Sequence, residues 1–225
     1  MTGGATTPCG GIWWDKAHTQ MGAIENELYL SVAAHLANRV PSNQTYYQNA
    51  AQSQWTWFQN SGMINADNTI NNGLNSSCQN DGGIVWSYNQ GVILGGLVEL
   101  ARSSSDGSLV SAAQAIANAA IANAAIANLT DVNGVLHDVC EAWGCGQDGN
   151  QFKGVFMRNL MELQQSAPVD AYKTFIDVNA DSIWANDRDS NNTLSEIWSG
   201  PFVASANAST HSSAMDALVA AASLN

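Results

Sequence analysis

The chain has 225 residues, enough for one large domain or two small ones, and its 19 acidic and 7 basic residues give a net charge of −12. That charge opposes contact with phosphate groups, so we expect no nucleic-acid partner. Hydrophobic residues make up 45% of the chain and charged residues 12%, which excludes a disordered protein. No apolar run approaches the roughly 18 residues of a membrane helix, so we expect no transmembrane segment.

Apolar residues recur at helical spacing along the chain, and alternating strand-like runs are almost absent. In the first such segment Ile24, Leu28 and Val32 follow at four-residue intervals, and the pattern closes before Pro41. The sequence predicts an all-α protein with seven helices, at 15–39, 45–60, 87–103, 108–128, 151–165, 169–186 and 206–223. Short turns alternate with long polar loops, which is typical of antiparallel helical hairpins whose long loops share one functional face.

The four cysteines allow three disulfide connectivities. Cys140 and Cys145 flank a loop of four residues that can close locally, so we expect a disulfide between them. Cys9 and Cys78 are then left to pair with each other or to stay free. No Cys-x-x-Cys spacing occurs and the histidines are scattered, so we expect neither a zinc site nor a cofactor.

Secretion is indicated by composition rather than by a leader sequence. The first nine residues lack the basic and apolar regions of a signal peptide. The chain is nevertheless poor in lysine and rich in asparagine and serine, and it contains five Asn-x-Ser/Thr sequons. The expected glycosylation sites are Asn43, Asn75, Asn128, Asn191 and Asn207.

Two blocks combine aromatic and amide side chains in a way that suits sugars. The motif Cys-Gly-Gly-Ile-Trp-Trp-Asp at 9–15 can offer flat faces to sugar rings, or it can supply core tryptophans and a helix N-cap at Asp15. Tyr88, Asn89 and Gln90 crowd into one predicted helix start, where amides can bind hydroxyl groups. Farther along, Arg158 is expected to form a structural ion pair.

Several long motifs follow one another in a fixed order. They are the block at 9–15, Ala-Ile-Glu-Asn-Glu-Leu at 23–28, Trp-Phe-Gln-Asn-Ser-Gly-Met-Ile-Asn at 57–65, Tyr-Asn-Gln-Gly-Val-Ile-Leu-Gly-Gly-Leu at 88–97, Gln-Phe-Lys-Gly at 151–154 and Ser-Ser-Ala-Met-Asp-Ala-Leu at 212–218. Together they resemble glycoside hydrolase family 76, the endo-α-1,6-mannanases that process fungal cell-wall mannan. The resemblance implies an (α/α)6 barrel, which needs twelve helices.

Seven helices therefore predict an incomplete arc of that barrel. We expect residues 1–8 to be an N-terminal tail and residues 9–225 to be one partial barrel domain without its N-terminal helices. An open arc leaves apolar faces uncovered at its N-terminal edge, so we also expect poor solubility or self-association of the isolated chain.

Catalysis by the family is retaining and, by the resemblance, uses an adjacent Asp-Asp pair, but no such dipeptide occurs here. The pairs Glu25/Glu27 and Asp187/Asp189 lie two residues apart on predicted helices, where side chains diverge by about 200°. We expect these carboxylates to be solvated or structural, and we assign no catalytic residue in this chain.

The resemblance predicts a mannan endo-1,6-α-mannosidase-like glycoside hydrolase with α-1,6-linked mannan or manno-oligosaccharide as its partner. A non-catalytic mannan-binding or cell-wall protein, and an incomplete gene model, are the alternatives. We expect sugar contacts at the motif positions near loop-facing helix ends. These are Trp14, Asp15, Asn26, Tyr88, Asn89, Gln90, Phe152 and Lys153.

Overall fold

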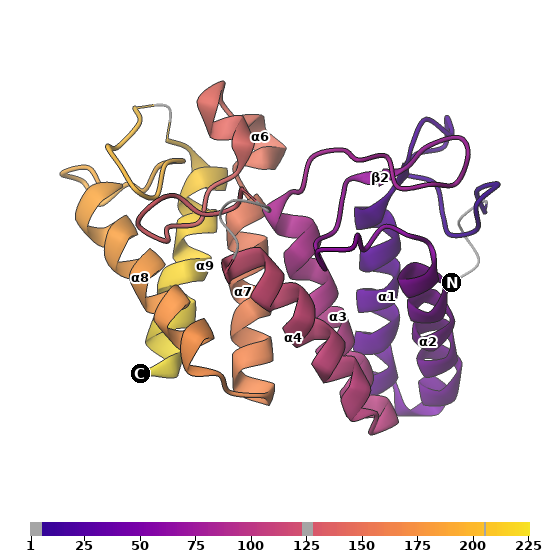
Figure 1. Ribbon diagram of the computed structural model, residues 1–225. Coiled ribbons are helices and arrows are strands. Elements are labelled where there is room, and N and C mark those ends of the chain that lie inside the picture. The colour runs from indigo at the N-terminus through magenta and orange to yellow at the C-terminus, as the bar shows by residue number, and fades with distance from the viewer. Residues whose placement is uncertain (1–5, 123–127, 205) are drawn as a thin grey trace.

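The computed structural model describes residues 6–122, 128–204 and 206–225 and is mostly helical (Figure 1). Its long helices are α1 (Ala23–Arg39), α2 (Gln44–Asn60), α3 (Ser87–Ser104), α4 (Gly107–Ala122), α7 (Phe152–Ser166), α8 (Asp170–Asn186) and α9 (Ala208–Leu224). Shorter elements are η1 (Pro41–Asn43), η2 (Val139–Ala142) and α6 (Gly146–Gly149), with the antiparallel strands β1 (Met21–Gly22) and β2 (Gly73–Leu74). No helix in these ranges is long and apolar enough to cross a membrane.

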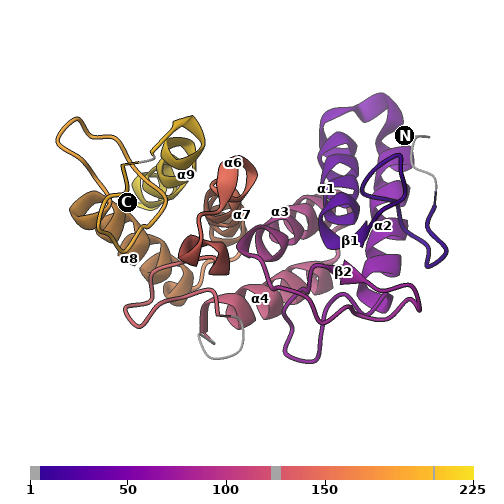
Figure 2. The same cartoon turned by 90° about the horizontal axis from the view of Figure 1, so that it is seen from above.

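The helices form a two-layered arc (Figure 2). α1, α3, α7 and α9 pack side by side as the inner layer, while α2, α4 and α8 cover them from outside. The inner helices all begin at one end of the arc, here called the loop face, where the long connections gather (Figure 1). The seven predicted helices are therefore present, and their pairing is that of an α/α barrel segment.

Close contacts between the inner helices depend on glycine. A Cβ at Gly91 of α3 would lie 2.5 Å from the Cα of Phe156 in α7, and one at Gly96 would lie 2.5 Å from the Leu30 side chain of α1. Such distances exclude a larger residue, so these glycines allow α3 to lie between its two neighbours. α3 is consequently buried along most of its length.

Two predicted helix boundaries are wrong. The first helix begins at Ala23 rather than at residue 15, because the preceding stretch turns through a left-handed His18 with φ of 60°. Asp15 caps no helix: its carboxylate accepts hydrogen bonds from the amide and hydroxyl of Thr19. The predicted helix 108–128 is described as α4 up to Ala122, and Asn128, with φ of 50°, lies outside any helix. Residues 123–127 lie outside the described residues.

Five seven-residue hairpins of one design occur in the described loops. Each is closed by a bridge between its first and seventh residues, and each has a left-handed residue at its fifth position. In the hairpin at 130–136, for example, the Asp131 carboxylate accepts the amides of Asn133 and Val135, and Gly134 takes a φ of 78°. The hairpins span residues 6–12, 64–70, 74–80, 130–136 and 188–194.

Four of these hairpins are held by a helix side chain that accepts the backbone N–H of the seventh hairpin residue. We call these side chains anchor residues. The pairs are Ile12 with Asn26 (2.9 Å), Ile70 with Gln90 (2.8 Å), Leu136 with Asn179 (2.8 Å) and Leu194 with His211 (3.3 Å). Three of the anchors are the fourth residue of the inner helix that follows the hairpin. Inner-helix starts and hairpins are thereby fixed to each other.

Both disulfides lie in the loops of this face. Cys140 and Cys145 are bonded, as the short loop between them predicted. Cys9 is bonded to Cys78, which settles the alternative left open for those two residues. The second bond joins the hairpin at 6–12 to the hairpin at 74–80, across 69 residues of sequence.

Replacing an anchor residue should destabilise the fold. Asn179→Ala leaves the buried amide of Leu136 without an acceptor, so we expect a loss of about 1–3 kcal/mol in the free energy of unfolding. Asn186→Ala, on the exposed side of the same helix, should change it by less than about 0.5 kcal/mol. Urea denaturation measures both, and equal effects of the two substitutions would contradict the anchoring role.

The two outermost inner helices expose apolar side chains. Leu28 and Val32 of α1 are 46% and 47% exposed, and Met215 and Val219 of α9 are 39% and 53% exposed. Each pair is spaced by four residues and so lies on one face of its helix. These faces are apolar patches of the kind that favours association.

We expect the chain to associate in a concentration-dependent way in sedimentation velocity. Leu28→Glu should shift it toward monomer, because a charge cannot be buried in an apolar contact without cost. Val132→Glu is the control, since Val132 is fully exposed but lies at the tip of a hairpin. A wild-type chain that stays monomeric over the whole concentration range would show that the prediction is wrong.

Candidate functional site

A depression of about 210 Å³ lies on the loop face, where α1, α3 and α7 begin. We call it the aromatic depression. Aromatic, amide and carboxyl side chains from five separate stretches of sequence line it. They are Trp14, Gln20, Ile24, Glu25, Asn72, Trp86, Tyr88 and Phe152.

One wall of the depression is a set of packed aromatic rings. Tyr88 and Phe152 stack with centroids 3.9 Å apart at 28°, and Trp86 meets Phe152 edge-on at 5.5 Å. Trp14 stands apart from them and is 56% exposed, so its ring is free to bind a flat apolar surface. Rings presented in this way suit the C–H faces of sugars, whose polar edges remain for amides such as Asn72.

The floor of the depression contains a carboxyl group that resists ionisation. Glu25 accepts the backbone N–H of Gly22 at the start of α1, and its Oε2 is buried without a hydrogen-bond partner among the described residues. Burial raises the pKa of Glu25. Glu27, two residues farther along α1 and fully buried, has its pKa raised well above the usual value by burial and by Glu25. Burial, then the charges of Glu27 and Glu25, also raise the pKa of Tyr88, which keeps its hydroxyl protonated.

A buried ionic cluster lies beside the depression. The Lys153 ammonium donates to the Glu141 carboxylate and, at 2.6 Å, to the Glu196 carbonyl, and it lies 4.6 Å from the Trp198 ring. Since Lys153 is only 4% exposed, little surface remains for a ligand. Lys153 therefore has a structural role in this cluster, and the sugar contact predicted for it stays a prediction.

Two buried aspartates lie near this cluster, and each accepts hydrogen bonds from the backbone amide and the hydroxyl of one serine. Asp138 accepts the amide and hydroxyl of Ser87, the first residue of α3, and so satisfies a free N–H at that helix start. Asp187 accepts the corresponding groups of Ser195. Burial raises the pKa of each aspartate to about 6, because the serine hydrogen bonds and Lys153 only partly offset the loss of hydration.

The structure brings together three of the eight predicted sugar contacts, Trp14, Tyr88 and Phe152, in the aromatic depression. Asp15 is half-buried, accepts hydrogen bonds from Thr19, and lies outside the depression lining. Its role as a contact stays a prediction. The depression also contains Gln20 and Asn72, which lie in no quoted motif, because the pairing of β1 with β2 brings these two segments together.

The three amide residues among the predicted contacts are buried and lie outside the depression lining, and the sugar contacts expected of them stay predictions. Asn26 and Gln90 are anchor residues, and Asn26 also accepts a hydrogen bond from Gln54 at 2.9 Å. Asn89 has no exposed surface, and neither of its polar side-chain atoms has a partner among the described residues. Two of the three amides thus fix the loop backbone at the starts of α1 and α3.

The carboxylate pairs have structural roles, one of the two alternatives expected for them, but only one pair lies on a helix. Glu25 and Glu27 lie on α1 and are buried. Asp187 follows the end of α8, and Asp189 belongs to the hairpin at 188–194, where it accepts the amides of Asn191 and Thr193. Each of the two aspartates therefore has a separate structural role. The expected ion pair of Arg158 is present, with Asp216 of α9 at 2.9 Å.

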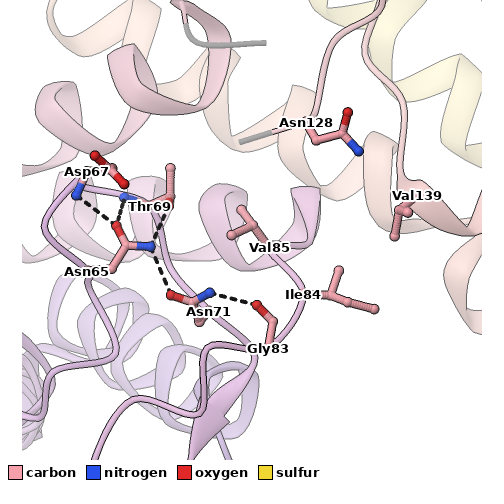
Figure 3. Close-up of a pocket in the computed structure, with 9 residues that line it drawn as sticks. All are labelled: Asn65, Asp67, Thr69, Asn71, Gly83, Ile84, Val85, Asn128 and Val139. Carbon is pink, nitrogen blue, oxygen red and sulfur yellow. Dashed lines mark hydrogen bonds between the residues drawn. The ribbon is translucent and has the colours of Figure 1, made fainter. Parts of the chain in front are cut away.

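A second pocket of about 350 Å³ lies beside the hairpin at 64–70 (Figure 3). Its amides bind one another: Asn65 donates to Thr69 and Asn71, and Asn71 donates to the Gly83 carbonyl at 2.7 Å. These side chains hold two loop segments together, so few polar groups remain for a ligand. The expected glycosylation site Asn128 lies at the rim of this pocket.

Only one cluster in the described part of the chain has the spacing of metal ligands, Cys140, Cys145 and Glu196. Its two cysteines are joined in a disulfide and offer no thiolate. Glu196 instead accepts the backbone N–H of Cys145 at 2.8 Å. This carboxylate therefore fixes the disulfide loop.

The fold and the loop-face depression define a member of a helical glycoside hydrolase family. The profile of glycosyl hydrolase family 76 matches residues 3–224, and the chain belongs to that family.

Relatives within the family carry mannosidase names. The mannan endo-1,6-alpha-mannosidase DFG5 of Saccharomyces cerevisiae is 25% identical over 172 residues, 71% of this chain and 36% of that protein. A putative mannan endo-1,6-alpha-mannosidase of Schizosaccharomyces pombe is also 25% identical, over 72% of this chain and 37% of its own length. The chain thus spans little more than a third of the length of these curated relatives.

Solved structures share the fold. An inactive variant of the alpha-1,6-mannanase of Salegentibacter sp. HEL1_6, with two neighbouring aspartates replaced and alpha-1,6-mannotetrose bound, matches with a TM-score of 0.81 at 20% identity, over 96% of this chain and 63% of that one. Dfg5 of Chaetomium thermophilum, in complex with glucosamine, matches with a TM-score of 0.78 at 19% identity, over 96% and 55%. The predicted α/α-barrel fold class is confirmed.

Buried carboxyl groups should make this protein more stable in mild acid. Asp138 and Asp187, with pKa values of about 6 against 3.8 when unfolded, bind protons more tightly in the folded state. The free energy of unfolding should therefore rise as the pH falls from about 7 to about 4.5. Glu99 acts oppositely: burial favours its neutral form, but hydrogen bonds from Arg39 and Asn38 outweigh that and lower its pKa to about 2. Stability should fall again below about pH 4.

Thermal melting across this pH range at constant ionic strength measures the effect. Asp138→Asn keeps an acceptor for Ser87 but removes one titrating group, so the rise in melting temperature toward acid should be smaller. Asp148→Asn on the exposed turn α6 should leave the profile unchanged. A melting temperature that falls steadily from pH 7 to 4.5 would contradict the assignment.

Proposed function

We propose that this chain forms the substrate-binding part of a mannan endo-1,6-α-mannosidase-like glycoside hydrolase, with α-1,6-linked mannan in the aromatic depression. One observation carries the proposal. The aromatic depression is lined by the rings of Trp14, Tyr88 and Phe152 and also by the side-chain amides of Asn72 and Gln20. Apolar faces flanked by amides suit a hydroxylated ring. The mannosidase names of the relatives support the same substrate class.

Hydrolysis with retention needs two carboxyl groups about 5 Å apart, one as nucleophile and one as acid. The sequence contains no Asp-Asp dipeptide. Glu25 lines the depression and Glu27 is fully buried, and burial raises the pKa of both carboxyl groups, so they are poorly suited to attack a sugar as carboxylates. We infer that the 225-residue chain binds mannan without cleaving it.

We further propose that the protein is a secreted glycoprotein that acts on cell-wall mannan. All five sequon asparagines are exposed, and Asn207 additionally caps α9 by accepting the amides of Ser209 and Thr210. The two disulfides suit an oxidising compartment. Loss of mass after enzymatic removal of N-glycans from protein made in a fungal host tests this proposal.

Calorimetry with α-1,6-mannotetraose tests the binding function. We expect saturable binding by the wild-type chain with no release of reducing sugar. Trp14→Ala should weaken binding roughly tenfold, which corresponds to about 1.4 kcal/mol for one lost stacking surface. Trp184→Ala is the matched control, because Trp184 is also half exposed but lies on the outer helix α8 under the Arg188 guanidinium.

Two results would overturn the proposal. The first is the absence of binding in the wild-type chain. The second is equal weakening by the Trp14 and Trp184 substitutions, which would show that the effect does not come from the depression. Release of manno-oligosaccharides by the purified chain would leave the substrate class intact, but would show that the chain carries catalytic carboxylates of its own.

A further inference from the structure

The disulfide loop, residues 140–145, presents a large aromatic side chain that no packing role explains. Trp143 is 66% exposed, more than any other large hydrophobic residue of the described chain except Val132. It follows η2 and precedes Gly144, whose φ of 85° turns the chain back toward Cys145. Exposing an indole ring forgoes the stabilisation that burial provides.

The loop that carries Trp143 is fixed at both ends. The Cys140–Cys145 disulfide closes it, and the backbone N–H of Trp143 donates to the Cys140 carbonyl at 3.0 Å. Glu196 holds the amide of Cys145 at 2.8 Å. Gly149 of α6 packs directly on the loop, since a Cβ there would lie 2.8 Å from the Cβ of Cys145. A ring on so constrained a loop loses little conformational entropy when it binds a ligand.

The same loop is tied to the aromatic depression. Glu141, two residues before Trp143, is paired with Lys153, whose neighbour Phe152 forms part of the depression wall. This ion pair joins the disulfide loop to the helix that carries Phe152, and Trp143 itself lies outside the depression lining. In the view from above, the start of α3 lies between β1, next to the Trp14 segment, and α6, next to the disulfide loop (Figure 2).

We propose that Trp143 is a second stacking surface for the bound glycan, one that takes a sugar unit beyond those held in the aromatic depression. This inference rests on the proposed function and deepens it. Trp14 and Trp143 are both exposed indoles, and the disulfide loop is joined through Glu141 and Lys153 to the helix that carries Phe152, so an oligosaccharide bound in the depression can extend toward Trp143. Trp143 then makes affinity depend on chain length, and the disulfide holds it in place.

Calorimetry of the 225-residue chain with α-1,6-linked oligomannosides from two to six units tests this role. Wild-type affinity should increase with length. Trp143→Ala should leave the affinity for the shortest oligomers unchanged. It should lower the affinity for the longest oligomers about 3- to 10-fold, the range expected for the loss of one stacking contact. Trp143→Tyr should keep part of the increase in affinity with oligomer length, and Trp184→Ala should show the same increase as the wild type. The double variant Cys140→Ser, Cys145→Ser should lose part of the same gain.

The outcomes separate this inference from the function on which it rests. If the wild type binds no oligomer of any length, the proposed function fails and this inference fails with it. If the wild type binds and Trp143→Ala keeps the full gain with length, only the role of Trp143 is wrong. An equal loss at every length also overturns it, since Trp143 would then act on the depression itself. Near-ultraviolet circular dichroism confirms that each variant is folded.

Discussion

The loop face of this protein depends on buried hydrogen bonds between anchor residues and hairpin backbones. An inner helix can begin where it does because a side chain on its first turn accepts an N–H that the incoming hairpin leaves unpaired, as Asn26 does for Ile12 and Gln90 for Ile70. Buried backbone groups need such partners. Trp14 follows the hairpin at 6–12, and Tyr88 lies on the first turn of α3, so two of the anchors help to position side chains of the aromatic depression.

Charge is distributed around the same helix starts. Lys153 is the cation that Glu141, Asp138 and Asp187 share, directly or at longer range, and it fixes η2 and the loop before α9 against α7. At the other end of the inner helices, Glu99 forms ion pairs with both Arg39 and Arg102. A buried ion pair of this kind adds little net stability, but removing one partner is strongly destabilising because the other charge is left buried and unpaired. The pair therefore favours one arrangement of the elements that carry it.

The exposed surface of the loop face is mainly aromatic because many of its polar side chains are already hydrogen-bonded within the protein. Asn26, Gln90 and Lys153 hold the backbone, and the amides of Asn65 and Asn71 hold one another. What the loop face offers outward is mainly rings, with Trp14 and Trp143 the most exposed of the tryptophans. A glycan is a suitable ligand for such a face, since stacking needs apolar surface while the sugar hydroxyls can stay in water.

The sequence by itself determined the helical class, six of the seven helix starts to within two residues, the family and the local disulfide. Periodicity, capping signals and short loop spacing are local properties, and they do not require knowledge of the rest of the chain. It also determined that three aromatic residues, Trp14, Tyr88 and Phe152, belong to motifs near helix ends. Their meeting in one depression agrees with that reading.

Tertiary structure alone decided which motif residues face the solvent. Asn26, Asn89 and Gln90 have the same chemistry whether they bind a sugar or a hairpin, and only the packing of α3 against α1 and the loops showed that they are buried. The late start of α1 came from the Asp15–Thr19 turn, the β1–β2 pairing and the Gly22–Glu25 cap. The five hairpins are weakly marked in sequence, because each requires only one capping side chain and one residue that tolerates positive φ. Long-range contacts, which no local pattern encodes, determined the rest.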